Sequence, residues 1–409
     1  MDLAARRREF PALDAPSDGP RLAYLDSAAT TLVSRAALAA TTGAIVSLGN
    51  PGRGAYARVQ AANDALRDAR ETVARALGGW HRDAWRSANE VVFTSGTTAS
   101  VNLVADAWGA ENVRAGDVVI VGEGEHHSNF LPWQRVCERT GASLVLAPLD
   151  DRGHVDLDAF RALARQHGER TKLVAIAHVG NVLGTVAPIA ELAQIAHGIG
   201  ARVFVDGAQA IAHLDVDVHA LGCDFYAFSG HKVYGAPGAG VLWATANALR
   251  APWQLGGGMV STVERSHATY RDAPARFEAG TPNLPAIASL ARALEWTRDL
   301  RGSSTMRDDE ASVHAALVET IRAAGARILG APEVGVVSFV WDYHPHDIAT
   351  IADRDGVALR SGHHCAQLVH RRFGVDASTR ASVAMYSGLD DVEQLARALA
   401  TVREVLGPR

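Results

Sequence analysis

Short apolar runs rich in β-branched residues recur along the first part of the chain. They occupy residues 91–93, 118–121, 144–146, 173–176, 203–205 and 225–228. The runs lack the polar alternation of half-exposed strands, and Ala-rich helical patterns at residues 157–166 and 189–197 lie between them. Strands of this kind are buried on both faces. The pattern therefore predicts an α/β fold with a mainly parallel sheet covered by helices.

The 409 residues exceed one compact core of ordinary size. After residue 282 a helical pattern (286–300) leads into a polar connection at 302–305. Beyond it come a further helical pattern, a strand (336–340) and a second helical pattern (346–355). We predict a large domain over residues 22–290 and a smaller α+β domain over residues 1–21 and 291–409. The active site should lie in the cleft between the two domains.

Composition excludes several classes of protein. The chain is 48% hydrophobic and 21% charged with a net charge of -5, as is usual for a soluble enzyme. Its basic residues are scattered, its first residues lack the long apolar region expected of a signal peptide, and no apolar run reaches about 18 residues. Its three cysteines stand too far apart for a disulfide framework. We expect a cytoplasmic protein that binds neither nucleic acid nor membrane.

Two polar segments follow two neighbouring predicted strands, Asp206-Gly-Ala-Gln209 and Ser229-Gly-His-Lys232. Ligands collect at the carboxyl ends of parallel strands. A lysine amine can bind a carbonyl cofactor as a Schiff base, and a carboxylate can keep a pyridine nitrogen protonated. Alone, Asp206 would be a helix cap and Lys232 a solvated lysine. Together they favour a pyridoxal phosphate site in which Gln209 contacts the phenolic oxygen and Ser229 and His231 contact the phosphate.

Two more strand ends carry polar side chains. Ser95-Gly-Thr-Thr98 precedes a helical pattern and would place hydroxyls and N–H groups around a phosphate, although an ordinary N-cap has the same residues. His126 follows the strand at 118–121. It would lie against a planar cofactor and assist proton transfer, or else be an exposed loop histidine.

Cys365 ends the segment Arg360-Ser-Gly-His-His-Cys365. Its polar neighbours fit an apolar core poorly, so we expect an exposed thiol, and basic neighbours favour the attacking thiolate. A metal site built from Cys365 and the histidines at 344, 346, 363 and 364 is the rival interpretation, but no Cys/His pair has zinc spacing and no metal is predicted. Arg360 and Arg380 are candidates for binding a substrate carboxylate, or are surface arginines.

In this order the segments resemble the group II cysteine desulfurases and selenocysteine lyases, which belong to the class V aminotransferase family of fold type I pyridoxal phosphate enzymes. The resemblance spans nearly the whole chain. The matching segments are residues 24–30, 96–98, 125–129, 132–134, 181–185, 206–209, 229–232, 276–283, 362–367 and 380–382.

The resemblance implies a role for each matching residue. Lys232, Cys365 and His126 would be catalytic, with Lys232 as the Schiff-base lysine and Cys365 as the sulfur acceptor. Asn181, Arg360 and Arg380 would bind the substrate. The implied cofactor-binding residues are Thr98, His126, Asn181, Asp206, Gln209, Ser229, His231, Lys232 and, from a second subunit, Thr281. A homodimer with shared active sites follows from the last of these.

The implied reaction converts L-cysteine to L-alanine, leaves a persulfide on Cys365 and passes the sulfur to an acceptor protein, as in iron–sulfur cluster assembly. A selenocysteine lyase is one alternative. Another class V reaction (transamination, epimerisation or kynureninase-type cleavage) would leave Cys365 incidental, and a non-catalytic binding protein would need neither Lys232 nor Cys365.

Four positions depart from the family pattern without touching the proposed cofactor anchors. Gly52 stands where the family has the histidine before Arg53, and Ala99 replaces a common acidic residue. Leu368 and Ser387 replace the usual Pro and Asn. These departures leave room for a paralogue that serves a specialised pathway.

Overall fold

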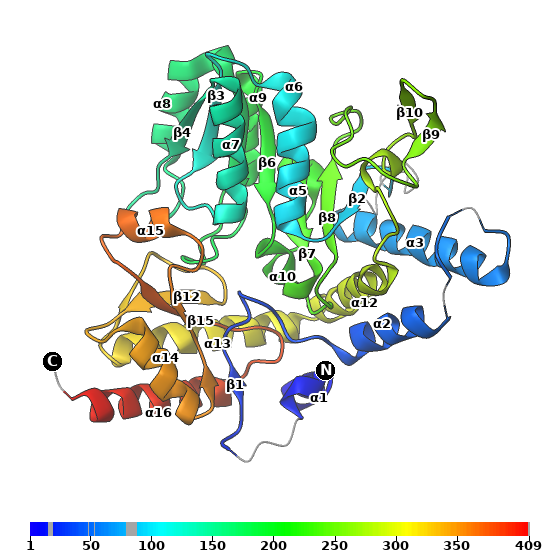
Figure 1. The fold of residues 1–409 in the computed structure, drawn as a ribbon. Coiled ribbons are helices and arrows are strands. Elements are labelled where there is room, and N and C mark those ends of the chain that lie inside the picture. The colour runs from blue at the N-terminus through cyan, green and yellow to red at the C-terminus, as the bar shows by residue number, and fades with distance from the viewer. Residues whose placement is uncertain (15–18, 48, 53, 79–87, 408–409) are drawn as a thin grey trace.

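The computed structural model describes residues 1–14, 19–47, 49–52, 54–78 and 88–407, so Arg53 lies outside the described residues. Figure 1 shows two bodies, a large one built around a central sheet and a smaller one formed mostly by the C-terminal part of the chain. The predicted α/β class with a mainly parallel sheet is confirmed.

The central sheet has seven strands in the order β2-β8-β7-β6-β5-β3-β4. The strands are β2 (Val91–Thr94), β3 (Val118–Gly122), β4 (Ser143–Ala147), β5 (Thr171–Ala177), β6 (Arg202–Asp206), β7 (Phe225–Ser229) and β8 (Gly240–Ala244). All six predicted strands are present. The seventh, β8, runs antiparallel to both neighbours. Its sequence follows a glycine-rich loop, which made the segment look like a turn.

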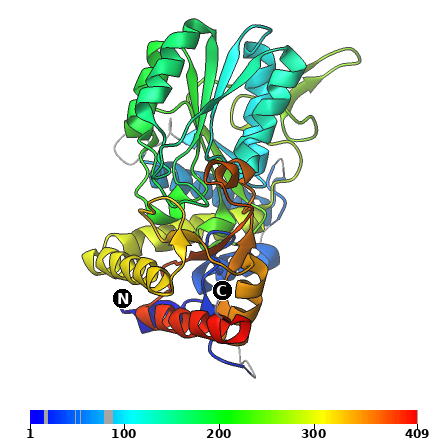
Figure 2. The same ribbon diagram turned by 90° about the vertical axis from the view of Figure 1, so that its left-hand side faces the viewer.

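Helices cover both faces of this sheet, as Figure 2 shows. The helices of this part of the chain are α2 (Arg35–Ser47), α3 (Ala57–Ala76), α5 (Thr97–Val104), α6 (Ala110–Asn112), α7 (Leu131–Thr140), α8 (Leu157–His167), α9 (Ile189–Gly198), α10 (Ala210–His213), α11 (Val218–Leu221) and α12 (Leu284–Arg301). Helix α1 (Leu3–Arg8) instead contacts the smaller body, where Arg6 pairs with Asp309 and Arg7 with Asp391. Within β3, Ile120 packs into one apolar cluster, whereas Val119 and Val121 pack into the other. Alternate side chains therefore serve opposite faces, which explains the continuous apolar runs.

The smaller body contains an antiparallel sheet in the order β11-β12-β15-β14. Its strands are β11 (Arg327–Ile328), β12 (Val336–Val340), β14 (Arg360–Gly362) and β15 (Ser378–Ser382). Its helices are α13 (Ser304–Ala323), α14 (Pro345–Arg354), α15 (Gln367–Arg372) and α16 (Leu389–Leu406). The strand and the two helices predicted after the polar connection are present as β12, α13 and α14. The polar connection is shorter than expected because α13 begins at Ser304.

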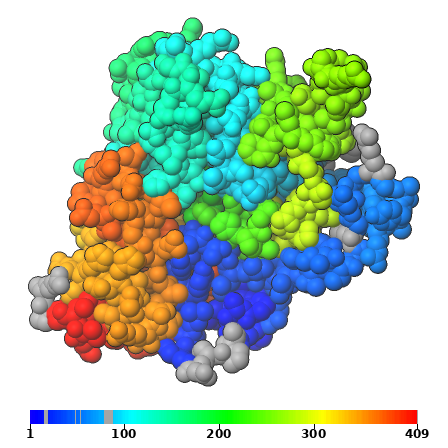
Figure 3. Space-filling view, in the orientation of Figure 1, coloured from blue at the N-terminus to red at the C-terminus, as the bar shows by residue number. Residues whose placement is uncertain are grey.

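Residues near the N-terminus join this smaller body. Strand β1 (Ala23–Tyr24) pairs in parallel with β13 (Val357–Ala358), and Ala23 and Leu25 lie in the apolar cluster of the C-terminal part. The domain boundaries at residues 22 and 290 stay a prediction. Figure 3 shows the segment around α15 directly against the surface of the larger body.

A separate hairpin, β9 (Val260–Val263) with β10 (Ala268–Tyr270), projects from the larger body in Figure 1. Among the described helices, none is both long and apolar enough to cross a bilayer.

Candidate active site

A cavity of about 230 Å³ lies where the carboxyl ends of β6 and β7 meet the smaller body. Residues from distant parts of the sequence converge on it. Eleven of the predicted site residues line it, namely Thr98, His126, Asn181, Asp206, Gln209, Ser229, His231, Lys232, Arg360, Cys365 and Arg380.

Asp206 and Lys232 enter the cavity from adjacent parallel strands. Asp206 ends β6, and Lys232 ends the short turn of residues 230–232 that follows β7. Burial lowers the pKa of Lys232, while the charge of Asp206 opposes the shift. Burial likewise raises the pKa of Asp206, against the Ala208 N–H that donates to its Oδ1 at 2.9 Å. The cavity thus pairs an amine of reduced basicity with a buried carboxyl group.

Hydroxyl groups gather at the first turn of α5. The Ser229 Oγ accepts the Thr97 N–H at 2.8 Å and lies 2.7 Å from the Thr97 Oγ1. Beside them, the hydroxyls of Thr98 and Ser128 are 2.7 Å apart. His231 lies close by, with its Nδ1 3.2 Å from the Thr30 hydroxyl. Hydroxyls and a helix N-terminus form a binding site for an anion.

The His126 ring is neutral and has a defined tautomer. Its Nδ1 accepts the Ser128 N–H at 3.0 Å, so the ring proton is on Nε2. Burial, assisted by the nearby positive charge of Lys232, lowers the pKa of His126 to about 3. A neutral imidazole can lie against a planar cofactor, and its Nε2–H remains available as a donor.

Gln209 and Asn181 are fixed by backbone carbonyls. The Gln209 Nε2 donates to Ala28 O at 2.7 Å, which holds the side chain at the cavity wall. The Asn181 Nδ2 donates to His364 O at 2.7 Å, and its backbone carbonyl accepts from Arg380 at 2.9 Å. Asn181 therefore connects the larger body to the segment that carries Cys365.

Arg360 and Arg380 are directly opposite each other on β14 and β15. Like charges in this position repel. Asp26 lies between them, with oxygens 3.2 Å from Arg380 and 3.7 Å from Arg360. The Arg380 side chain is 3% exposed and that of Arg360 52%. One carboxylate does not neutralise two guanidinium groups, so the pair suits a second anion such as a substrate carboxylate.

Cys365 is an exposed thiol on the cavity wall, as the sequence predicted, whereas Cys137 and Cys223 are buried. Its carbonyl accepts the His127 N–H at 2.7 Å, so the two bodies meet at this residue. Burial raises the pKa of Cys137 to about 11. Of the three thiols, Cys365 is the one placed for chemistry in the cavity.

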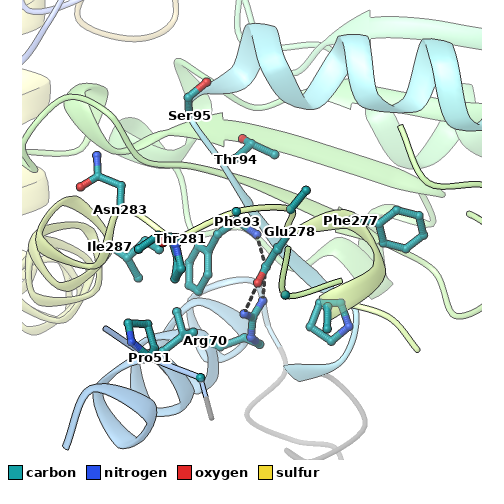
Figure 4. A pocket seen from close by; sticks show the side chains of 18 of the residues that line it. Pro51, Arg70, Phe93, Thr94, Ser95, Phe277, Glu278, Thr281, Asn283 and Ile287 are labelled. Carbon is teal, nitrogen blue, oxygen red and sulfur yellow. Dashed lines mark hydrogen bonds and ion pairs between the residues drawn. The ribbon is translucent and has the colours of Figure 1, made fainter. Parts of the chain in front are cut away.

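Thr281 does not reach this cavity. It is exposed and lines a second cavity of about 910 Å³. Figure 4 shows Thr281 there, near the ion pair of Arg70 from α3 with Glu278. Gly52 and Ala99 line the same space. The role of Thr281 in a second subunit's site stays a prediction.

Several residues of the first cavity were not predicted. Thr97, Ser128 and His364 line it, and Asp26 binds both arginines. All four stand inside segments that the sequence marked as distinctive, which was the available signal. Their roles depend on partners far away in the chain, and spacing alone does not reveal such partners.

Comparison with known proteins agrees with this geometry. The aminotransferase class V family model matches residues 23–395. A cysteine desulfurase of Klebsiella pneumoniae is 42% identical over 407 residues, and one of Salmonella gallinarum is 40% identical over 408, each alignment covering 98% of both chains.

Solved structures agree as well. A cysteine desulfurase of Escherichia coli has a TM-score of 0.87 at 35% identity, covering 99% of both chains. The cysteine desulfurase of Thermococcus onnurineus has a TM-score of 0.89 at 32% identity, covering 99% of this chain and 98% of the other. The chain belongs to the class V aminotransferase family and, within it, to the cysteine desulfurases.

Proposed function

We propose that this protein is a pyridoxal phosphate-dependent cysteine desulfurase that converts L-cysteine to L-alanine and holds the sulfur as a persulfide on Cys365. The observation that supports this most directly is one cavity that brings Lys232, Asp206 and the exposed Cys365 together. Lys232 alone is compatible with many class V reactions. A thiol facing the same cavity favours sulfur chemistry among them.

The residues present fit the cofactor. Lys232 supplies the amine that would hold it covalently, and Asp206 the carboxylate for its ring nitrogen. Thr98, Ser229 and His231 would hold the phosphate, Gln209 the phenolic oxygen and His126 the ring face; these side chains line one cavity. When bound, pyridoxal phosphate supplies an electron-accepting ring that makes the α-proton of an amino acid acidic.

The chain's own residues would carry out the other steps. Arg360 and Arg380 would hold the substrate carboxylate, and Lys232, whose pKa is lowered by burial, would take the α-proton. The Cys365 Sγ would then attack the substrate sulfur. A sulfur–sulfur bond forms as the carbon–sulfur bond breaks, and the alanyl product is protonated and leaves.

A sulfur acceptor, a protein or a reductant, would next remove the terminal sulfur from Cys365. We further propose a homodimer in which Thr281 serves the partner's phosphate site. Its exposure in the single chain, at the edge of the second cavity, supports this proposal. The cytoplasmic location expected from the sequence stays a prediction.

The test is to measure alanine and sulfide produced from L-cysteine by the cofactor-loaded enzyme and by Cys365→Ala. We expect Cys365→Ala to lose sulfide release by at least about 100-fold while keeping the visible absorbance of the cofactor. Cys137→Ala, which removes a buried thiol, is the matched control and should retain activity. Undiminished sulfide release by Cys365→Ala would contradict the proposal.

Selenocysteine is the second substrate to compare. A selenocysteine lyase would release alanine from selenocysteine in the Cys365→Ala variant, whereas the desulfurase reaction with L-cysteine requires the thiol. Failure of the wild-type enzyme to form alanine from either substrate would favour another class V reaction.

A further inference from the structure

The backbone at Cys365 has a conformation that most side chains avoid. His364 and Cys365 have φ values of 51° and 56°. The Ala366 N–H donates to His363 O at 2.9 Å, so residues 363–366 form a tight turn with two left-handed residues at its centre. Such turns normally carry Asn or Gly at these positions, because other side chains are disfavoured in the left-handed region. This strain persists only where other contacts hold the turn.

Two contacts from the larger body hold carbonyl groups of this turn. The His127 N–H donates to Cys365 O, and the Asn181 Nδ2 donates to His364 O, both at 2.7 Å. They hold the turn from the larger body. The opposite side is held by side chains of the smaller body.

There, the Ser378 hydroxyl lies between two imidazole rings. Its Oγ is 3.0 Å from the His364 Nε2 and 2.9 Å from the His370 Nε2. The other nitrogen of His370, Nδ1, is 3.0 Å from Ala366 O. Ser378 is 0% exposed, His370 1% and His364 8%. The chain of hydrogen bonds is therefore shielded from water.

The Ala366 carbonyl, at one end of this series of hydrogen bonds, determines which atom is the donor in each of them. The Ala366 carbonyl only accepts, so the proton of His370 is on Nδ1 and its Nε2 is an acceptor. Ser378 must donate to that nitrogen. The Ser378 oxygen can then accept from the Nε2–H of His364. Burial lowers the pKa of both rings, that of His364 to about 2, which keeps them neutral as this arrangement requires.

We propose that Ser378 is a positioning residue that holds the strained Cys365 turn in the conformation from which the thiol attacks. Through two imidazoles its hydroxyl is linked to the residue before Cys365 and to the carbonyl of the residue after it. Ser378 is also two positions before Arg380 on β15. One strand therefore fixes both the nucleophile and the arginine that would bind the substrate carboxylate. This inference rests on the proposed role of Cys365.

The neighbouring residue supplies a matched control. Thr379 is also 0% exposed and lies on the same strand, but its Oγ1 has no hydrogen-bond partner among the described residues. Thr379→Val therefore removes a buried hydroxyl of β15 that makes no hydrogen bond to the described residues. Ser378→Ala removes the one that joins His364 to His370.

The experiment compares the cofactor-loaded wild type with Ser378→Ala and Thr379→Val in alanine formation from L-cysteine. We expect Ser378→Ala to lose about 10- to 100-fold in kcat with KM changed less than about 2-fold, because the nucleophile is misplaced while the substrate still binds. Cofactor absorbance should stay the same. Hydrogen exchange of the Ala366 amide should be faster. Thr379→Val should match the wild type in all four measurements.

A second variant interrupts the same series of hydrogen bonds at its other end, at Ala366 O. His370→Leu removes the contact to Ala366 O, and it should lower kcat by an amount similar to Ser378→Ala. The double variant should be no worse than either single variant, since all three lose the same chain. Ser378→Thr, which keeps the hydroxyl, should recover most of the activity. If Ser378→Ala fails to bind the cofactor, His370→Leu decides by the same criteria.

A wild-type kcat in Ser378→Ala, equal losses in Ser378→Ala and Thr379→Val, or additive losses in the double variant would each overturn this inference. These results are distinct from failure of the proposed function. That failure would show as undiminished sulfide release by Cys365→Ala, whatever the behaviour of Ser378.

Discussion

Lys232 and Cys365 face the same cavity, but the backbone that carries them differs. Asp206 ends β6 and Lys232 follows β7, two paired parallel strands that are buried on both faces. Cys365 lies in a turn whose two central residues are in the left-handed region, and the turn is held by contacts from both bodies of the molecule. Regular structure thus supports Lys232 and Asp206, the residues proposed to bind the cofactor (the cofactor side). Specific hydrogen bonds support Cys365, the proposed sulfur acceptor (the sulfur side). The first depends on the fold as a whole, and the second depends on a few atoms.

The largest effect should come from the cofactor side. Lys232→Ala removes the residue proposed both to attach the cofactor and to act as the base, so activity should fall by about 1,000-fold or more, measured as alanine formation. The chain contains just two lysines, and Lys172→Ala is the control. Lys172 lies at the start of β5, donates to Glu169 O and is not among the residues that line the cavity, so its loss should leave activity unchanged. Borohydride reduction followed by peptide mapping should label Lys232 and not Lys172; the reverse labelling would disprove the assignment.

A smaller effect is expected where the two regions meet. Asn181→Ala removes the hydrogen bond to His364 O but keeps the backbone carbonyl that Arg380 contacts. An unpaired buried carbonyl costs about 1–3 kcal/mol. We expect kcat to fall by about 10-fold with the cofactor absorbance retained.

The control for this prediction is Asn112→Ala, which removes a comparable side-chain bond to Trp108 O on a helix. A loss of cofactor in Asn181→Ala, without a loss of kcat in the loaded enzyme, would assign Asn181 to the cofactor side alone.

The smallest effect concerns the pH dependence of the free energy of unfolding, to which His178, the residue after β5, contributes. Burial lowers the pKa of His178 to about 4, and its Nδ1 is 3.1 Å from the Tyr226 hydroxyl. The unfolded chain takes up a proton near pH 6.5, while the folded protein does so near pH 4. Stability contributed by the neutral ring is therefore complete above pH 6.5 and is lost as the pH falls from 6.5 to 4, by about 1 kcal/mol per pH unit.

His178→Phe should remove this dependence. Urea unfolding at pH 6 and pH 5 measures it as the difference in free energy of unfolding between the two conditions. We expect that difference to be smaller in His178→Phe than in the wild type. Equal differences would show that His178 is protonated alike in the folded and unfolded states.

The same contrast explains what could be predicted from the sequence. The strands around Val203 and Phe225 can be predicted from their continuous apolar composition. That the polar residues at their ends share one site follows from the geometry of parallel sheets. Strand β8 was missed because a glycine-rich loop precedes it. For the segment around Cys365 the sequence predicted an exposed loop thiol and its role as sulfur acceptor, but not its backbone geometry. Its left-handed turn and the hydrogen bonds of Ser378 depend on residues brought together by folding, which no local pattern records.

The shortness of the turn at residues 363–366 has a consequence for how sulfur leaves. Hydrogen bonds from both bodies of the molecule hold the backbone of this four-residue turn. The Cys365 sulfur can therefore move only by rotation of its own side chain. The Cys365 thiol cannot carry a bound sulfur atom to an acceptor that lies far from the cavity. Under the proposed function, the sulfur acceptor must therefore bring its own accepting group to the Cys365 thiol in the cavity.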